Sequence, residues 1–305
     1  MTAETPETPP RQPVAGLYLV ATPIGNLEDI TLRALALLRG VDLILAEDTR
    51  RTRKLLSHYD IHASMKSLHE HNEEAQASRL AARMAAGESM ALVSDAGTPL
   101  ISDPGHLLVR EAVAAGVPVV PVPGASSLLA ALTASGLALE RFTFTGYLPR
   151  KSGPRRRLFE SLCAEVGTLV FLESPRRLAR SLAEAADVLG PRQIAVAREL
   201  TKVHEEIIRG TLPEVAAHFA ATEARGEVTV CVAGCGGESA ENTDTLDTLP
   251  ERIAALDRDA LGRRLEALIA GGTPRNEALK QIAGEHRVSR RDMYKLLMIG
   301  TEETP

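Results

Sequence analysis

The residues best suited to chemistry lie in a loop from Ser94 to Gly105, directly after the short apolar run Met90 to Val93. This loop contains two glycines, two prolines and two aspartates, the last being Asp95 and Asp103. Glycine lets a ligand approach the main chain, whereas proline fixes φ and makes a loop rigid. A rigid polar loop at the carboxyl end of a buried strand is where open α/β sheets bind small molecules. A connector with two tight turns is the alternative.

Two further loops of the same kind follow other apolar runs. One contains Pro23 and Gly25 after the run 17–21, and the other extends from Pro123 to Ser127 after the run 117–122. Three such loops in one chain favour a binding cleft over simple connectors.

Apolar runs and helical periods alternate along the first part of the chain, which predicts a doubly wound parallel sheet. Its strands are expected at 17–21, 43–46, 90–93 and 117–122, with helices at 31–38, 49–57, 74–86 and 106–115. A second αβ set has expected strands at 141–146, 168–173, 194–198, 205–210 and 227–232. The runs 194–198 and 205–210 are close enough to form a hairpin, which predicts a mixed sheet.

These patterns divide the chain into five parts. We expect a disordered tail at 1–13, an N-terminal αβ domain at 14–123 and a C-terminal αβ domain at 124–235. A Gly-, Ser- and Thr-rich linker is expected at 236–250, and a small helical domain at 251–305, whose last two helices span about 274–286 and 289–298. The fold class is therefore α/β.

Composition excludes several classes of protein. The net charge of -5 means that any nucleic-acid surface must be a local patch. The three cysteines form no CxxC pair, and His69 and His71 lack zincin spacing, so we expect no metal site and a reducing compartment. The chain has no signal-peptide pattern and no run long enough to cross a bilayer, so we expect a cytoplasmic protein. Neither a G-x-G-x-x-G fingerprint after the first strand nor a P-loop is present.

Seven motifs in a fixed order resemble those of the bacterial small-subunit rRNA cytidine 2′-O-ribose methyltransferases, a branch of the tetrapyrrole methylase superfamily. The resemblance covers about residues 17–235, and the C-terminal tail is similar too. The motifs lie at 21–29, 46–50, 94–105, 122–127, 144–151, 173–178 and 197–202.

The resemblance implies two αβ domains of the tetrapyrrole methylase type, with S-adenosylmethionine bound in the cleft between them through the main chain of several loops. It also implies 16S rRNA in the small ribosomal subunit as substrate, and a homodimer. The cofactor-binding residues implied in this way are Pro23, Asp95, Ala96, Gly97, Ile101, Ala125, Ser126, Leu172 and Ala197. Packing and helix capping are the alternative roles for several of them, such as Leu172 and Ser126.

A ribose hydroxyl is weakly acidic, so a general base is expected to assist methyl transfer. Glu199 and Lys202 are the candidate catalytic residues, with Asp103 and Glu173 as weaker ones and a surface ion-pair network as the alternative. No motif in the sequence identifies the base.

A run of five cations in eight residues is the candidate RNA-binding segment. Positive charge at a helix N-terminus is opposed by the helix dipole, so an anionic partner explains it better than stability does. The five residues are Arg150, Lys151, Arg155, Arg156 and Arg157. The basic run Arg50 to Lys54 and the cations of the C-terminal tail fit either RNA contact or a solvated or packed surface equally well.

The sequence leaves two other functions open. One is a small-molecule methylase acting on a tetrapyrrole, although such a substrate needs neither the cation run nor the helical tail. The other is a non-catalytic RNA-binding factor of ribosome assembly, which would not need the rigid 94–105 loop.

Overall fold

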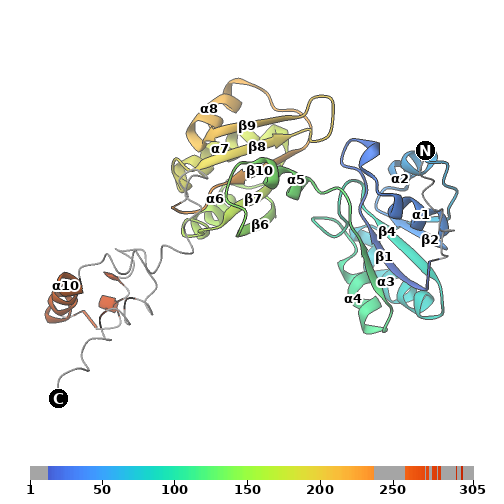
Figure 1. The fold of residues 1–305 in the computed structure, drawn as a ribbon, viewed down its shortest axis with the longest axis horizontal. Coiled ribbons are helices and arrows are strands. Elements are labelled where there is room, and N and C mark those ends of the chain that lie inside the picture. Colours follow the sequence, from blue (N-terminus) through green and yellow to red (C-terminus); the bar gives the residue numbers. More distant parts are fainter. Residues whose placement is uncertain are drawn as a thin grey trace, which may run out of the picture. The chain divides into compact units, whose positions relative to one another are not determined.

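The computed structural model describes residues 13–236 and 258–271, together with residues 273, 274, 277–279, 281, 282, 293 and 297. The chain forms two compact units, which divide between Ala240 and Glu241 (Figure 1). The predicted tail at 1–13 and linker at 236–250 lie almost wholly outside the described residues. Within the first unit, two successive αβ regions carry one sheet each, as predicted.

The first sheet is parallel throughout and has the order β3-β2-β4-β1-β5. Its buried strands form from continuous apolar runs, as expected for a sheet covered on both faces. The sequence prediction missed β3, a half-buried strand of three residues. The strands are β1 (Gly16–Val20), β2 (Leu43–Ala46), β3 (Met65–Ser67), β4 (Ser89–Val93) and β5 (Val119–Val122).

Helices cover both faces of this sheet, which confirms the doubly wound arrangement. Leu35 and Leu38 of α1 and Leu56 of α2 pack on one face, and Leu80 of α3 and Leu108 of α4 pack on the other. The helices are η1 (Leu27–Asp29), α1 (Leu32–Gly40), α2 (Thr49–His58), α3 (Glu70–Ala85) and α4 (His106–Ala114).

The connections that leave the neighbouring parallel strands β1 and β4 lead to opposite sides of the sheet. From β1 the chain passes through α1 to β2, whereas from β4 it passes through α4 to β5 on the other side of β1. The loops that follow β1 and β4 therefore diverge at the carboxyl edge of the sheet. Such a switch point is where doubly wound sheets bind their ligands.

The second sheet is mixed and has the order β6-β7-β10-β8-β9. Strands β6 and β7 are parallel, and the remaining pairs are antiparallel, including the predicted hairpin of β8 and β9. The strands are β6 (Phe142–Tyr147), β7 (Thr168–Glu173), β8 (Gln193–Arg198), β9 (Glu206–Thr211) and β10 (Val228–Val232).

Different helices cover the two faces of the second sheet. Phe159 of α6, Leu182 of α7 and Phe219 of α8 pack on one face. Leu132 of α5 packs on the other, together with Ile24 from the loop after β1, so this face is turned toward the first αβ region. The helices are α5 (Ser127–Ala134), α6 (Ser152–Ser161), α7 (Pro175–Leu189) and α8 (Leu212–Ala221).

The second unit contains α10 (Arg258–Ala270), which confirms a helix in the predicted helical domain. Leu261 and Leu265 of α10 are buried together with Ala278, Leu279 and Ile282. The two helices predicted at 274–286 and 289–298 lie largely outside the described residues. No helix in the described part of the chain is both long and apolar enough to cross a membrane.

Candidate active site

Hydrogen bonds join the three predicted loops of the first αβ region. The amide of Thr22 donates to the carbonyl of Gly97 at 2.9 Å, and the amide of Gly97 donates back to Thr22 at 2.9 Å. The hydroxyl of Thr98 donates to the carbonyl of Ala125 at 3.2 Å. The structure therefore brings together the loops that contain Pro23, the 95–97 run and Ala125, as a shared binding site requires.

The backbone of the 94–105 loop is held in unusual conformations. Leu100 and Ser102 have φ angles of 73° and 68°, in the left-handed region that side chains rarely adopt. The carboxylate of Glu73, on α3, accepts hydrogen bonds from the amides of Gly105 and Leu108, both at 3.0 Å. Sequence reasoning missed this anchor because it began the helix at residue 74, four residues later than the structure does.

Close packing fixes the first loop against its neighbours. A Cβ on Gly124 would lie 2.9 Å from the Cβ of Ala21, and one on Gly25 would overlap the side chain of Lys202. The amide of Asn26 donates to the hydroxyl of Thr201 at 3.0 Å. The loop after β1 therefore contacts the turn that follows β8, which links the two αβ regions at the site.

The candidate catalytic residues Glu199 and Lys202 lie in this turn and bind each other. The Lys202 Nζ is 2.9 Å from Glu199 Oε1 and 3.3 Å from Glu227 Oε2. The hydrogen bond from Lys202 is the main reason why the pKa of Glu199 is lowered. Burial acts to lower the pKa of Lys202, but Glu199 and Glu227 outweigh it and raise that pKa. A carboxylate with a lowered pKa and a lysine with a raised pKa are both poorly suited to accept a proton from the substrate.

An acidic edge, defined by Glu47, Asp95 and Asp103, lies where β2 and β4 end. Burial, followed by the charges of Glu47 and Asp95, raises the pKa of Asp103 to about 6, and a hydrogen bond with Ser94 opposes the shift. Burial and Asp95 likewise raise the pKa of Glu47. Asp95 itself pairs with Arg51 at 3.2 Å and accepts a hydrogen bond from the amide of Asp48. Asp103 is therefore the carboxyl group of this edge best placed to exchange a proton near neutral pH.

The remaining predicted cofactor residues lie around the same loops. Ile101 is exposed on the 94–105 loop, and Ser126 caps α5 by accepting a hydrogen bond from the amide of Leu129. Leu172 on β7 and Ala197 on β8 both lie opposite Thr229 on β10. These two residues therefore share the face of the second sheet that contains Ala195 and Cys231 and is turned toward the first αβ region.

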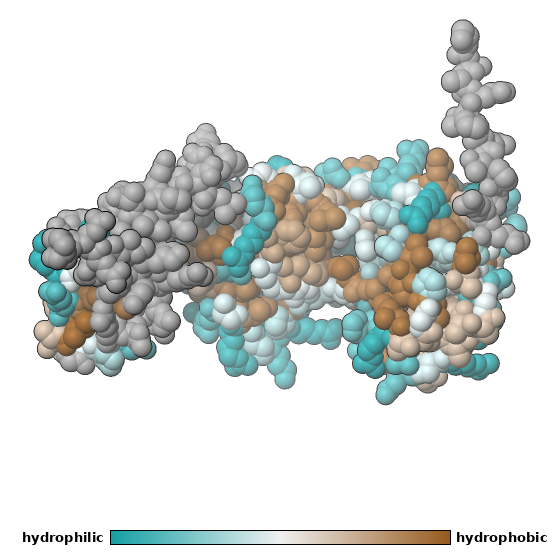
Figure 2. Space-filling view, turned by 60° about the horizontal axis from the view of Figure 1, so that its bottom comes forward, coloured by the Kyte–Doolittle hydropathy of each residue, from teal (hydrophilic) through white to brown (hydrophobic). Residues whose placement is uncertain are grey.

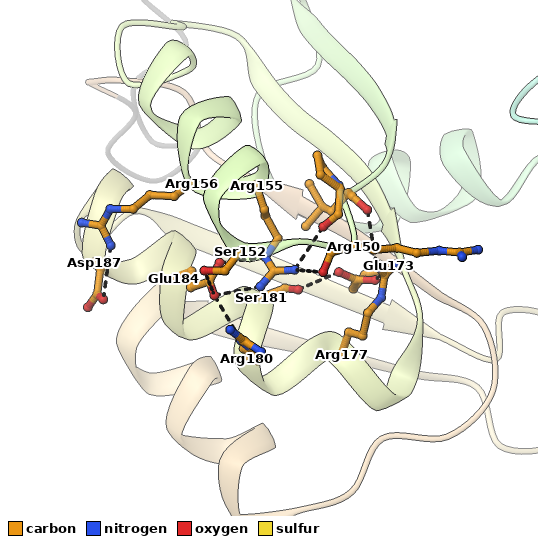
Figure 3. A network of polar contacts seen from close by, with 12 residues as sticks. Arg150, Ser152, Arg155, Arg156, Glu173, Arg177, Arg180, Ser181, Glu184 and Asp187 are labelled. Atoms are coloured by element: carbon orange, nitrogen blue, oxygen red, sulfur yellow. Dashed lines mark hydrogen bonds and ion pairs between the residues drawn. The ribbon is translucent and has the colours of Figure 1, made fainter.

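The structure contradicts the prediction that Arg155 contacts RNA. Its side chain is 1% exposed, and its guanidinium donates to both carboxylate oxygens of Glu184 at 2.8 Å and to the carbonyl of Pro149 at 3.1 Å (Figure 3). Arg155 and Glu184 therefore form an ion pair that joins α6 to α7. Arg150 and Arg156 point away from this pair in Figure 3. The four exposed cations of the run are Arg150, Lys151, Arg156 and Arg157.

Comparison with known proteins settles the family. The model of the Tetrapyrrole (Corrin/Porphyrin) Methylases matches residues 16–216, which include the whole first sheet and strands β6 to β9 of the second. The chain belongs to the tetrapyrrole methylase family.

Relatives of this methylase include the Ribosomal RNA small subunit methyltransferase I of Synechocystis sp., which is 44% identical over 281 residues, 92% of this chain and 96% of that protein. The protein of the same name from Mesorhizobium japonicum is 50% identical over 251 residues, 82% of this chain and 85% of that protein. Among solved structures, a uroporphyrin-III C-methyl transferase from Thermus thermophilus, complexed with S-adenyl homocysteine, has the same fold, with a TM-score of 0.51. It is 24% identical and covers 72% of this chain and 97% of its own.

Proposed function

We propose that this methylase transfers a methyl group from S-adenosylmethionine to the ribose 2′-hydroxyl of a cytidine in the decoding region of 16S rRNA. The observation that carries the proposal is the match, over 92% of the chain, to a protein named Ribosomal RNA small subunit methyltransferase I. The convergence of the three loops supports it, because a non-catalytic RNA-binding factor would not need them.

The residues at the site fit S-adenosylmethionine. This cofactor carries a sulfonium, an ammonium and a single carboxylate group but no phosphate, so it needs neither a P-loop nor a cluster of cations. The carboxylates of the acidic edge suit a positively charged ligand. Pro23, Asp95, Ala96, Gly97, Ile101, Ala125, Ser126, Leu172 and Ala197 would hold the cofactor.

When bound, the cofactor supplies a methyl group already activated on sulfur, so alignment of the attacking oxygen supplies most of the catalysis. The attacking hydroxyl would gain this methyl group and lose its proton. The hydroxyl proton must then go to a base. We assign this role to Asp103, which lies on the 94–105 loop. The groups that shift its pKa include no cation that would hold the carboxylate ionised, so it can accept a proton.

With Asp103 as the base, Glu199 and Lys202 act as positioning residues that hold the turn after β8 against the loop after β1. Their ion pair fixes the turn whose Thr201 hydroxyl accepts the hydrogen bond from Asn26. The turn also has two left-handed residues, Glu199 and Thr201, with φ angles of 50° and 68°. Loss of the pair would loosen the contact between the two αβ regions without removing the base.

RNA phosphates would bind the exposed cations Arg150, Lys151, Arg156 and Arg157. Of these, Arg156 is near Glu160 and Asp187, at 3.5 and 4.0 Å, and both of those side chains are exposed. Exposed ion pairs contribute little to stability, so exchanging them for phosphate costs little.

The proposal includes a cytoplasmic homodimer. Large exposed apolar side chains support association, among them Leu129 on α5 and Leu139 before β6. Figure 2 shows that hydrophobic residues gather in patches on one face of the described chain.

The test incubates the protein with S-adenosylmethionine labelled in the methyl group and with small ribosomal subunits that lack the modification. Digestion of the RNA and identification of the labelled nucleoside follow. We expect 2′-O-methylcytidine. Label in a different nucleoside, or none in RNA while the cofactor still binds, would overturn the proposal.

A further inference from the structure

Tyr147 stands at the end of β6 where the strand changes its register. The pairing of β6 with β7 is regular from Phe142 to Phe144 and resumes, shifted, at Tyr147. Gly146 has a φ of 69° within this irregularity. An extra residue in a strand turns the following side chain in a new direction, and such bulges are frequent beside active sites. The result here is an aromatic side chain that is 59% exposed.

Charged groups from both αβ regions surround the Tyr147 phenol. Burial raises its pKa, as do Glu227, Asp103 and Glu173, while Arg177 opposes the shift. Asp103 belongs to the 94–105 loop, and Glu227 binds Lys202. A Cβ on Gly146 would lie 3.7 Å from the hydroxyl of Ser102, so β6 ends beside that loop. Tyr147 therefore follows directly on a residue that lies against the loop of the proposed base.

The strand end is not optimised for stability. The hydroxyl of Thr145 is buried and has no hydrogen-bond partner among the described residues. An unpaired buried hydroxyl and an interrupted strand ladder each cost stability, and here they are adjacent. Arg177, whose charge acts to lower the Tyr147 pKa, is itself held by Glu173, Ser174 and the carbonyl of Leu148 (Figure 3). The surroundings of Tyr147 are thus fixed while its ring stays open to a ligand.

We propose that Tyr147 is the aromatic platform on which the base of the acceptor nucleotide stacks. This inference rests on the proposed function. A base whose ribose is to be methylated must leave its neighbours in the RNA, and unstacked bases are bound by aromatic side chains in sequence-tolerant fashion. In the described part of the chain, Phe142 and Tyr147 are the only exposed phenylalanine or tyrosine side chains. Tyr147 ends β6 beside the 94–105 loop, whereas Phe142 begins the strand.

The first experiment compares Tyr147→Ala and Tyr147→Phe with the wild type. It measures binding of an oligonucleotide with the acceptor sequence, binding of S-adenosylmethionine and single-turnover methylation of small subunits. Phe142→Ala is the matched control, because it removes an exposed aromatic ring from the same strand. We expect Tyr147→Ala to weaken oligonucleotide binding about 5- to 150-fold, the 1–3 kcal/mol typical of base stacking. We expect Tyr147→Phe and Phe142→Ala to stay within about twofold of the wild type.

A second arm uses an oligonucleotide without a base at the acceptor position. If Tyr147 stacks on that base, the wild type loses affinity for the abasic oligonucleotide, whereas Tyr147→Ala binds both oligonucleotides equally. The inference would be overturned if the loss of affinity caused by Tyr147→Ala and the loss caused by the missing base were additive, because the ring would then contact something other than that base.

Other results identify other roles. Loss of S-adenosylmethionine binding in Tyr147→Ala would make the ring part of the cofactor site, and a large loss of rate in Tyr147→Phe would make the phenol a proton-transfer group. Either result would overturn the inference. If the wild type methylates no subunit, the proposed function fails. If the wild type methylates subunits and Tyr147→Ala binds RNA and methylates equally well, only the platform fails.

Discussion

The acidic side chains in the two αβ regions have opposite environments. In the first, Asp103 is half-buried beside two other carboxylates, and its pKa is raised. In the second, Glu184 is neutralised by Arg155, and Glu173 by Arg177 and the hydroxyl of Ser181. Like charges leave a carboxylate ready to take a proton, whereas a guanidinium holds it ionised and in place. The same functional group is thus the proposed proton acceptor in one region and a structural ion-pair partner in the other.

The largest expected effect comes from removing the carboxylate of the proposed base, Asp103. Asp103→Asn should lower the single-turnover rate of methylation by about 10²- to 10⁴-fold, the usual contribution of a general base. In the wild type the rate should rise with pH through an inflection near 6 and then level off, because the carboxylate must be ionised to accept a proton. This inflection should be absent from the variant. The measurement is a pH–rate profile at cofactor concentrations far below saturation, which reports the pKa values of the cofactor-free enzyme.

The same variant should be more stable at neutral pH. The folded-state pKa of Asp103 lies above its ordinary value, so its contribution favours folding at low pH and is lost as the pH rises through about 6. Thermal unfolding at pH 7 should therefore give a higher Tm for Asp103→Asn. Asp60→Asn, an exposed control, should change neither rate nor Tm. A normal rate in Asp103→Asn would show that another group is the base.

Breaking the structural pair should affect folding instead of chemistry. Arg155→Ala leaves Glu184 without its main partner, and removal of one member of a buried pair costs about 3–5 kcal/mol of the free energy of unfolding. Denaturant titration measures this loss. Arg156→Ala, the next residue along α6 and an exposed one, should change stability by less than about 0.5 kcal/mol. Equal stability of the two variants would mean that Arg155 does not hold α6 to α7.

The exposed cations should affect RNA binding alone. Replacing Arg150, Arg156 and Arg157 together by Gln should weaken RNA binding and reduce the slope of log affinity against log salt by about 2, at about 0.7 per phosphate contact in single strands. Cofactor affinity should stay unchanged. A slope equal to that of the wild type would place the RNA on another surface.

The smallest effect is expected at the turn after β8. Lys202→Ala removes the ion pair with Glu199 and Glu227 but not the proposed base, so we expect a loss of rate below about tenfold and an unchanged pH inflection. The same single-turnover assay measures both quantities. A loss of 10²-fold or more would return Lys202 to the role of a residue that acts directly in proton transfer.

The sequence predicted the strands well because they are uninterrupted apolar runs. The predicted bounds of β2 and β7 are those found, and the β8–β9 hairpin is present. The prediction missed β3, since Met65–Ser67 has no apolar run, and the order of strands could not be read from local patterns.

The site was only partly predictable, for a related reason. The loops follow from glycine and proline, which act locally. The environment of a charged side chain depends instead on residues distant in the sequence. Arg155 donates a hydrogen bond to Glu184, 29 residues away, and the pKa of Asp103 is raised by Glu47. A run of cations therefore looks uniform in the sequence although one member is buried.

Close packing at Gly124 and Gly25 also limits which sequences this fold can use. Neither position leaves room for a methyl group, because the neighbouring Ala21 and Lys202 occupy that space. A library of random substitutions selected for activity should therefore lose almost all variants at Gly124, as it would at Asp103, and fewer at Gly25, where the flexible Lys202 side chain can move aside. Tolerance to mutation would then map where the loops touch as well as where the chemistry occurs, and only unfolding measurements would tell the two apart.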